Sequence, residues 1–202
     1  MIPGRLVLAS GNAGKVRELE ALVREWPEAV QVCSLTDFPD VTLPDETGAT
    51  YEENACLKAA AVSAATGLAA LADDSGLDVD ALGGAPGVRS ARYGRDDADR
   101  ITKLLAALDG RSAATRTARF RCVTVLAWPD GRLAVGEGVV EGVITEAPVG
   151  DGGFGYDPVF RSIELGRTFA EVSAGAKAGV SHRARAMRAL GERLARGVGV
   201  ED

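Results

Sequence analysis

The segment from Ser10 to Lys15, Ser-Gly-Asn-Ala-Gly-Lys, has the composition of an anion-binding turn. It follows the apolar run Leu6–Ala9 and precedes a helical pattern, which predicts a strand, a tight turn and a helix N-terminus. Backbone N–H groups and the helix dipole favour an anion there, and Lys15 adds a full positive charge. A Walker A loop is excluded, because only two residues separate the glycines and Val16 follows the lysine. The alternative is an ordinary strand-to-helix turn with a surface lysine.

Two adjacent carboxylates, Asp73 and Asp74, follow the apolar run Leu68–Ala72, which predicts a buried strand. We expect a turn from Asp73 to Gly76 at the carboxyl end of that strand. Neighbouring negative charges repel each other unless a cation lies close, and Mg²⁺ prefers carboxylate oxygens. Glu46, in the preceding loop, would add a carboxylate from another segment. The alternative is a turn with solvated aspartates.

A glycine-rich segment, Gly150–Pro158, contains the pattern Gly-x-Gly-x-x-Gly around Phe154. We reject a dinucleotide-binding motif, because that motif must open a helix and Tyr-Asp-Pro does not. Four glycines suit a backbone that wraps closely around a flat ligand, on which Phe154 could stack. The alternative is a flexible hairpin loop with Phe154 in the core.

The chain's single histidine, His182, lies beside Arg183 just inside a predicted helix N-terminus, and Lys177 precedes them. This combination favours an anion or a carbonyl-rich ring. The alternative is an ordinary surface helix start.

Lys58 lies four residues after Asn54, so both side chains share one face of a predicted helix. Thr50 and Glu53 form the capping-box pattern that opens this helix, and Gly67 stands where a glycine cap ends it. Lys58 points either into a binding cleft or, as the alternative, out to solvent.

These residues must be positioned by alternating strands and helices followed by a meander, which predicts a mixed α/β sheet. Within the meander, the hairpin signal Pro129-Asp130-Gly131 joins the two predicted strands at 118–128 and 132–140. We expect one domain over residues 1–202 with two lobes facing a cleft. Helices are expected at residues 15–26, 50–66, 97–108 and 181–196, and strands at 6–9, 30–35, 68–72, 118–128, 132–140 and 143–146.

Composition narrows the classes of protein. The chain has 202 residues, 46% apolar, with 23 basic and 29 acidic residues and a net charge of −6. An acidic chain is a poor non-specific nucleic-acid binder, and no apolar run reaches the ~20 residues of a membrane span. Without a signal peptide pattern, and with three widely spaced cysteines that suit reduced thiols, the chain is expected in the cytoplasm.

Taken together, the motifs resemble those of the inosine triphosphate pyrophosphatase family, in its bacterial dITP/XTP pyrophosphatase form. They occur in the family's order and spacing across nearly the whole chain. The matching stretches begin with Ser10–Lys15, Glu46–Thr50, Glu53–Ala55 with Lys58-Ala59, and Ala72–Leu77, and continue with Leu82–Val88, Ser90–Tyr93, Gly152–Pro158 and Ser181–Arg183.

The resemblance implies an elongated α/β fold of two lobes around a central mixed sheet. It implies Mg²⁺-dependent hydrolysis of ITP, dITP and XTP to the monophosphate and pyrophosphate, which cleans the nucleotide pool, and it implies a homodimer. One departure is Gly175-Ala176, where members of the family often carry acidic residues just before the position of Lys177.

The resemblance also implies a role for each matching residue. Asp74 is the catalytic base and a metal ligand, and Glu46 is the second metal ligand. The implied substrate-binding residues are Ser10, Gly11, Asn12, Ala13, Gly14, Lys15, Lys58, Ser75, Phe154, Gly155, Tyr156, Asp157, Lys177, His182 and Arg183.

A mechanism follows as a hypothesis. Asp74 activates a water that attacks the α-phosphorus, while Lys15, Lys58 and Lys177 neutralise the leaving pyrophosphate. Donors near His182 and Arg183 would bind the 6-keto oxygen, which adenine lacks. Three alternatives stay open: a pyrophosphatase for dTTP, UTP or modified nucleotides, a nucleotide sensor without turnover, and a structural α/β module.

Overall fold

The structure is a computed structural model that describes residues 2–112 and 115–196. Its strands form one mixed sheet in the order β2-β1-β3-β4-β5-β6. β1 pairs in parallel with β2 and β3, and β5 pairs antiparallel with β6. The prediction of a mixed α/β sheet is therefore confirmed. The strands are β1 (Arg5–Leu8), β2 (Gln31–Ser34), β3 (Ala69–Val79), β4 (Thr117–Ala127), β5 (Leu133–Ile144) and β6 (Phe160–Ser162).

The helices begin and end largely where local signals predict. Thr50 caps its helix in a reciprocal capping box with Glu53, and Gly67 ends that helix with a left-handed φ of 67°. Asn12 caps the first helix, accepting hydrogen bonds from the backbone N–H groups of Gly14 and Lys15. The helices are α1 (Ala13–Val23), α2 (Tyr51–Thr66), α3 (Asp97–Ala107), α4 (Ala174–Val180) and α5 (His182–Arg196).

The chain divides into two compact units, and strands β3, β4 and β5 contribute residues to both. Unit 1 comprises residues 2–74, 122–138 and 183–196, and unit 2 comprises residues 75–112, 115–121 and 139–182. The lobes and the cleft expected from the sequence stay predictions.

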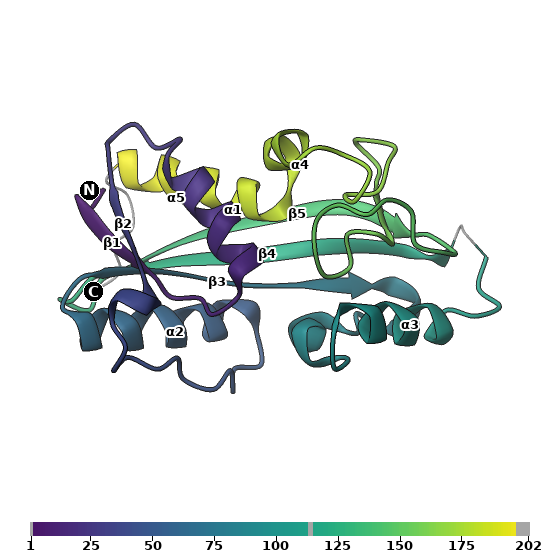
Figure 1. Cartoon of the computed structure of the whole chain (residues 1–202), viewed down its shortest axis with the longest axis horizontal. Coiled ribbons are helices and arrows are strands. Elements are labelled where there is room, and N and C mark those ends of the chain that lie inside the picture. Colours follow the sequence, from purple (N-terminus) through teal and green to yellow (C-terminus); the bar gives the residue numbers. More distant parts are fainter. Residues whose placement is uncertain (1, 113–114, 197–202) are drawn as a thin grey trace. The chain divides into compact units, whose positions relative to one another are not determined.

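Unit 1 has two hydrophobic cores, one on each face of its strands. Leu71 of β3 packs with α1 and α5, whereas Ala70 and Ala72 pack with α2. Figure 1 shows α2 on the opposite side of β3 from α1 and α5. Successive side chains of a strand point to opposite faces. The next two residues of β3, Asp73 and Asp74, must therefore point to opposite faces as well.

Unit 2 has a core rich in aromatic residues. Phe120 of β4 lies 4.5 Å from Phe160 and 5.9 Å from Phe169, measured between ring centroids. Leu77 and Val79, from the second half of β3, are fully buried in the same cluster.

The turn predicted from Asp73 to Gly76 is wrong, because β3 continues through these residues to Val79. The strand has eleven residues, and Asp73 and Asp74 are both buried within it. Their charges are matched by basic residues from distant segments, as described below, so extended backbone carries them without solvation.

The separate strand predicted at residues 143–146 is also wrong, because β5 runs unbroken to Ile144. Two short elements, β6 and α4, were not predicted. β6 has three residues and α4 has seven, too few to show a clear hydrophobic period.

The structure also bears on membrane-spanning helices and on the state of the cysteines. Within residues 2–112 and 115–196, no helix combines the length and apolarity needed to cross a bilayer. Cys33, Cys56 and Cys122 are all free thiols, as predicted; Cys33 and Cys122 are buried, and Cys56 is only partly so.

Candidate functional site

In unit 1, Asp73 and Asp74 point to opposite faces of β3 and meet different partners. Asp73 lies on the face of α1 and α5, and Asp74 lies on the face of α2. The repulsion expected between adjacent carboxylates is therefore reduced by the strand geometry itself.

The Asp73 carboxylate is a counterion for two basic residues. Its Oδ2 atom lies 3.2 Å from the Nζ of Lys15 and accepts hydrogen bonds from the Nε and Nη2 of Arg183 at 3.1 and 3.0 Å. Burial alone would raise the pKa of Asp73, but Lys15, Arg183 and Lys58 hold that pKa well below its ordinary value. Asp73 is therefore ionised at neutral pH.

Asp74 has the opposite character. Its Oδ2 accepts a hydrogen bond from Asn54 Nδ2 at 3.1 Å, and its Oδ1 lies 3.9 Å from Lys58 Nζ. Burial raises the pKa of Asp74 above its ordinary value; Lys58 and Lys15 oppose this rise, and Glu46 adds to it. Asp74 is therefore a carboxylate that accepts a proton more readily than an exposed one.

Lys58 joins Asp74 to Glu46, two carboxylates that are far apart in the sequence. Its Nζ donates to Glu46 Oε1 at 2.7 Å and to the backbone carbonyl of Asp73 at 2.7 Å. Lys58 is only 6% exposed, so the alternative of a solvated surface lysine is wrong. Asn54 and Lys58 share one helix face and both reach Asp74, as their spacing predicts.

The donor set suits a hard divalent cation. Glu46 and Asp74 already lie around one positive charge, and carboxylate oxygens are the ligands Mg²⁺ prefers. Among the described residues, no group of three or more His, Cys, Asp and Glu side chains forms a metal-binding cluster. Water and phosphate oxygens would have to complete the coordination, as is usual for Mg²⁺ at phosphate-binding sites.

The segment Ser10–Lys15 forms the strand-to-helix connection that the sequence predicts. Ser10 Oγ accepts a hydrogen bond from the backbone N–H of Asn12 at 3.3 Å, and Ala13 and Gly14 are already the first residues of α1. Gly11 is exposed, and Lys15 lies in the first turn of the helix. This is the arrangement that favours an anion at a helix N-terminus.

In unit 2, Asp157 organises the glycine loop, residues 150–157. Its Oδ2 atom accepts hydrogen bonds from the backbone N–H of Phe154 at 2.9 Å and from Lys177 Nζ at 2.6 Å. The same ammonium lies 4.8 Å from the Phe154 ring centroid, a cation–π distance. Lys177, from α4, and Asp157 are both buried, so the loop is held by a desolvated ion pair.

The remaining predicted residues of unit 2 have distinct surroundings. Phe154 is half-buried and lies outside the aromatic core, which excludes the alternative that it is tucked into it. The Tyr156 hydroxyl donates to the Ser90 carbonyl at 3.0 Å, and burial raises its pKa. His182 is buried, with its ring 4.6 Å from that of Phe120 and nearly parallel to it. Ser75 is half-buried in β3.

Arg183, from α5 in unit 1, was predicted as a nucleotide-binding residue. Each of its three guanidinium nitrogens bonds a carboxylate: two bond Asp73, and Nη1 bonds Glu18. Its predicted contact with the nucleotide stays a prediction, but these ion pairs are its clearest structural feature.

Sequence reasoning missed two supporting residues. Glu18 lies three residues after Lys15 on α1, a spacing that places them on one helix face. Asp97, at the start of α3, accepts a hydrogen bond from the backbone N–H of Gly155 at 2.7 Å, and no local pattern indicates this contact.

The glycine loop provides a test of packing. A Cβ at Gly153 would lie 2.1 Å from Asp157 Oδ2, and its φ is +74°. Gly166 has a similar φ of +64°, but a Cβ there would meet nothing within 4 Å. We expect Gly153→Ala to lower the free energy of unfolding by about 1–3 kcal/mol more than Gly166→Ala, measured by urea denaturation. Equal losses of unfolding free energy in the two variants would show that the Asp157 side chain moves away from the added Cβ at little cost.

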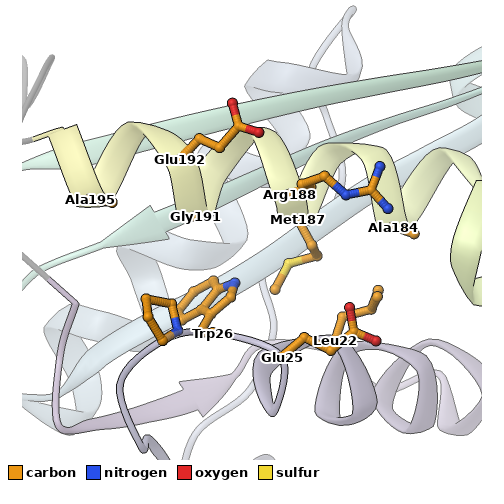
Figure 2. Close-up of a pocket in the computed structure, with 10 residues that line it drawn as sticks. Leu22, Glu25, Trp26, Ala184, Met187, Arg188, Gly191, Glu192 and Ala195 are labelled. Atoms are coloured by element: carbon orange, nitrogen blue, oxygen red, sulfur yellow. The ribbon is translucent and has the colours of Figure 1, made fainter.

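A separate pocket of about 360 Å³ lies between α1 and α5 in unit 1 (Figure 2). Leu22, Trp26 and Met187 give it an apolar floor, and Glu25 and Arg188 line it as well. None of the residues predicted to bind substrate or metal is among its lining residues. It is therefore distinct from the candidate site.

Comparisons with known proteins agree with the motifs. The Ham1 family matches residues 6–193. The dITP/XTP pyrophosphatase of Thermus thermophilus is 54% identical over 188 residues, covering 92% of this chain and 89% of the relative. That of Geobacillus kaustophilus is 52% identical over 190 residues, covering 93% and 92%.

Solved structures agree as well. A HAM1 protein from Coxiella burnetii has a TM-score of 0.84 at 41% identity, covering 95% of this chain and 98% of that one. A nucleoside-triphosphatase / dITP/XTP pyrophosphatase from Mycobacterium abscessus has a TM-score of 0.74 at 43% identity, covering 92% and 98%. The resemblance drawn from the sequence motifs is confirmed, and the chain belongs to the Ham1 family.

Proposed function

We propose that the protein is a Mg²⁺-dependent pyrophosphohydrolase that converts ITP, dITP and XTP to the monophosphate and pyrophosphate. The observation that carries the proposal is the pair of carboxylates, Glu46 and Asp74, around the single ammonium of Lys58. The names of the relatives support the choice of substrate.

Glu46 and Asp74 are the residues that would hold Mg²⁺. When bound, the ion would neutralise phosphate charge and stabilise the negative charge that develops on the leaving pyrophosphate. Asp74 takes a proton from a water that attacks the α-phosphorus, and the bond from that phosphorus to the bridging oxygen breaks. The raised pKa of Asp74 suits a general base, since the best bases have pKa values near the working pH.

The basic residues of unit 1 have separate tasks in this proposal. Lys15, at the N-terminus of α1, binds the phosphates together with the backbone of residues 10–14. Lys58 binds them while staying close to the carboxylates. Asp73 remains ionised and keeps Lys15 in place.

A second set of residues binds the nucleotide in this proposal. Phe154 stacks on the purine ring, and donors of the segment His182–Arg183 bind the 6-keto oxygen. Adenine carries an amino group at that position, so binding ATP leaves buried donors without an acceptor, at about 1–3 kcal/mol each. In unit 2 the ammonium of Lys177 is matched by Asp157, so we assign this lysine to shaping the loop as well as to binding substrate.

The test is a panel of ITP, dITP, XTP, ATP, GTP, dTTP and UTP, assayed for pyrophosphate release with Mg²⁺ and with EDTA. We expect release from the first three, dependent on Mg²⁺. Preference for dTTP or UTP would favour the related pyrophosphatases instead, and binding without release would favour a nucleotide sensor.

Homodimer formation and a cytoplasmic location stay predictions.

Phe154→Ala tests the stacking. Losing the ring should raise the KM for ITP by about tenfold, because base–aromatic stacking contributes about 1–3 kcal/mol. Steady-state kinetics with ITP measure this, with Ile163→Ala, which truncates an exposed apolar side chain, as the control. An unchanged KM would count against stacking.

A further inference from the structure

Glu18, Arg183, Asp73 and Lys15 form a continuous chain of ion pairs within unit 1. Arg183 bonds Glu18 through Nη1 and Asp73 through Nε and Nη2, and Asp73 contacts Lys15 at 3.2 Å. The side chains of Arg183 and Asp73 are 1% and 0% exposed, whereas those of Lys15 and Glu18 are 16% and 27% exposed. The chain therefore has a buried centre and two partly exposed ends.

The charges within this row of ion pairs balance, because it contains two basic and two acidic side chains. Asp73 contacts two cations through one atom, because Lys15 and Arg183 both contact its Oδ2. The Glu18 carboxylate supplies Arg183 with a second counterion. Without Glu18, Lys15 and a buried guanidinium would compete for one carboxylate and repel each other.

We propose that Glu18 is a positioning residue for Lys15, acting through Arg183 and Asp73. It fixes the guanidinium on its outer side, so that Asp73 keeps a lone pair for the Lys15 ammonium. Lys15 is then held at the N-terminus of α1, where phosphate is expected. This inference rests on the proposed function, because it takes Lys15 to be a phosphate-binding residue.

A positioning role for Glu18 and a simple effect of its negative charge would change phosphate binding in opposite directions. Removing any negative charge near a phosphate site should strengthen the binding of a polyanion. If Glu18 positions Lys15, its replacement weakens that binding instead. Glu20 lies on the same helix and is not part of the ion-pair chain, so Glu20→Gln reports the field effect alone.

The experiment compares Glu18→Gln, Glu20→Gln, Lys15→Met and the double variant Glu18→Gln/Lys15→Met. Binding of inorganic tripolyphosphate is measured by calorimetry, and KM and kcat are measured with ITP. We expect Glu18→Gln to raise both the Kd and the KM by about five- to tenfold, with a smaller change in kcat. Glu20→Gln should lower both or leave them within about twofold. In the Lys15→Met background, Glu18→Gln should have almost no further effect, because coupled residues are not additive.

An equal effect of Glu18→Gln with and without Lys15 would overturn the inference, as would tighter binding. Glu18→Asp, which keeps the charge on a shorter side chain, should restore part of the affinity and is the variant to use if Glu18→Gln does not fold. Failure of the proposed function is distinguishable, because wild-type protein would then release no pyrophosphate from ITP. The tripolyphosphate Kd would still test the link between Glu18 and Lys15.

Discussion

Replacing Asp74 by Asn should lower the kcat for ITP by about a hundred- to ten-thousandfold while making the folded protein slightly more stable. The loss follows from removing the proposed general base and metal ligand. The gain follows from burial, which raises the pKa of Asp74, so that its ionised form destabilises the native state at neutral pH. An Asn side chain has the same shape without that charge.

Because the folded chain holds the Asp74 proton more tightly than the unfolded chain, this group destabilises the fold as pH rises through its raised pKa. Urea denaturation at pH 7 with EDTA measures the gain, and steady-state kinetics with Mg²⁺ measure the loss. Asp78→Asn is the matched control, since Asp78 lies on the same strand and pairs with Arg121. Turnover by Asp74→Asn at a near wild-type rate would exclude Asp74 as base or essential ligand.

Local sequence patterns predicted the elements that depend on local interactions. The capping box joins Thr50 to Glu53, three positions away. The backbone N–H of the cap residue Gly67 bonds the carbonyl of Ser63, four positions away. The helices expected at residues 15–26, 50–66, 97–108 and 181–196 correspond to α1, α2, α3 and α5. These features need no knowledge of distant partners, so the sequence alone suffices for them.

Distant partners explain where prediction failed. Asp-Asp-Ser-Gly is a sequence typical of turns, yet β3 passes through it because Arg183, 110 residues away, binds Asp73. The sequence motifs identified the acidic and basic residues of the candidate site, but they did not show which basic residue pairs with which carboxylate. Glu18 carried a weak signal, its spacing from Lys15, and Asp97 carried none.

The different roles of the two aspartates follow from a period-two geometry that no residue-type pattern shows. One side chain faces α1 and α5 and is surrounded by Lys15 and Arg183; the other faces α2, beside Lys58 and Glu46. A turn would have exposed both carboxylates to the same solvent. The strand instead makes one a structural counterion and the other a candidate base.

Replacing Asp73 by Asn should therefore have the opposite effect on stability to Asp74→Asn. Removing this carboxylate leaves the buried Arg183 guanidinium and Lys15 without their shared counterion. Breaking one side of a buried ion pair costs about 3–5 kcal/mol, and Glu18 would remain as the counterion of Arg183 while Lys15 would lose the carboxylate it contacts. Urea denaturation of both variants under identical conditions compares the two neighbouring positions directly.

The pH dependence of stability in the wild type and in Asp73→Asn tests the role of Asp73 as a counterion. Lys15, Arg183 and Lys58 lower the pKa of Asp73, so its contribution to stability is fully present above the ordinary pKa of an unfolded aspartate. That contribution is lost as pH falls below about 4 towards the lowered value in the folded state. Wild-type stability should fall over this acid range more steeply than that of Asp73→Asn, which lacks the carboxylate at this position. Parallel acid-denaturation curves for the two proteins would mean that Asp73 is not the counterion of this buried network.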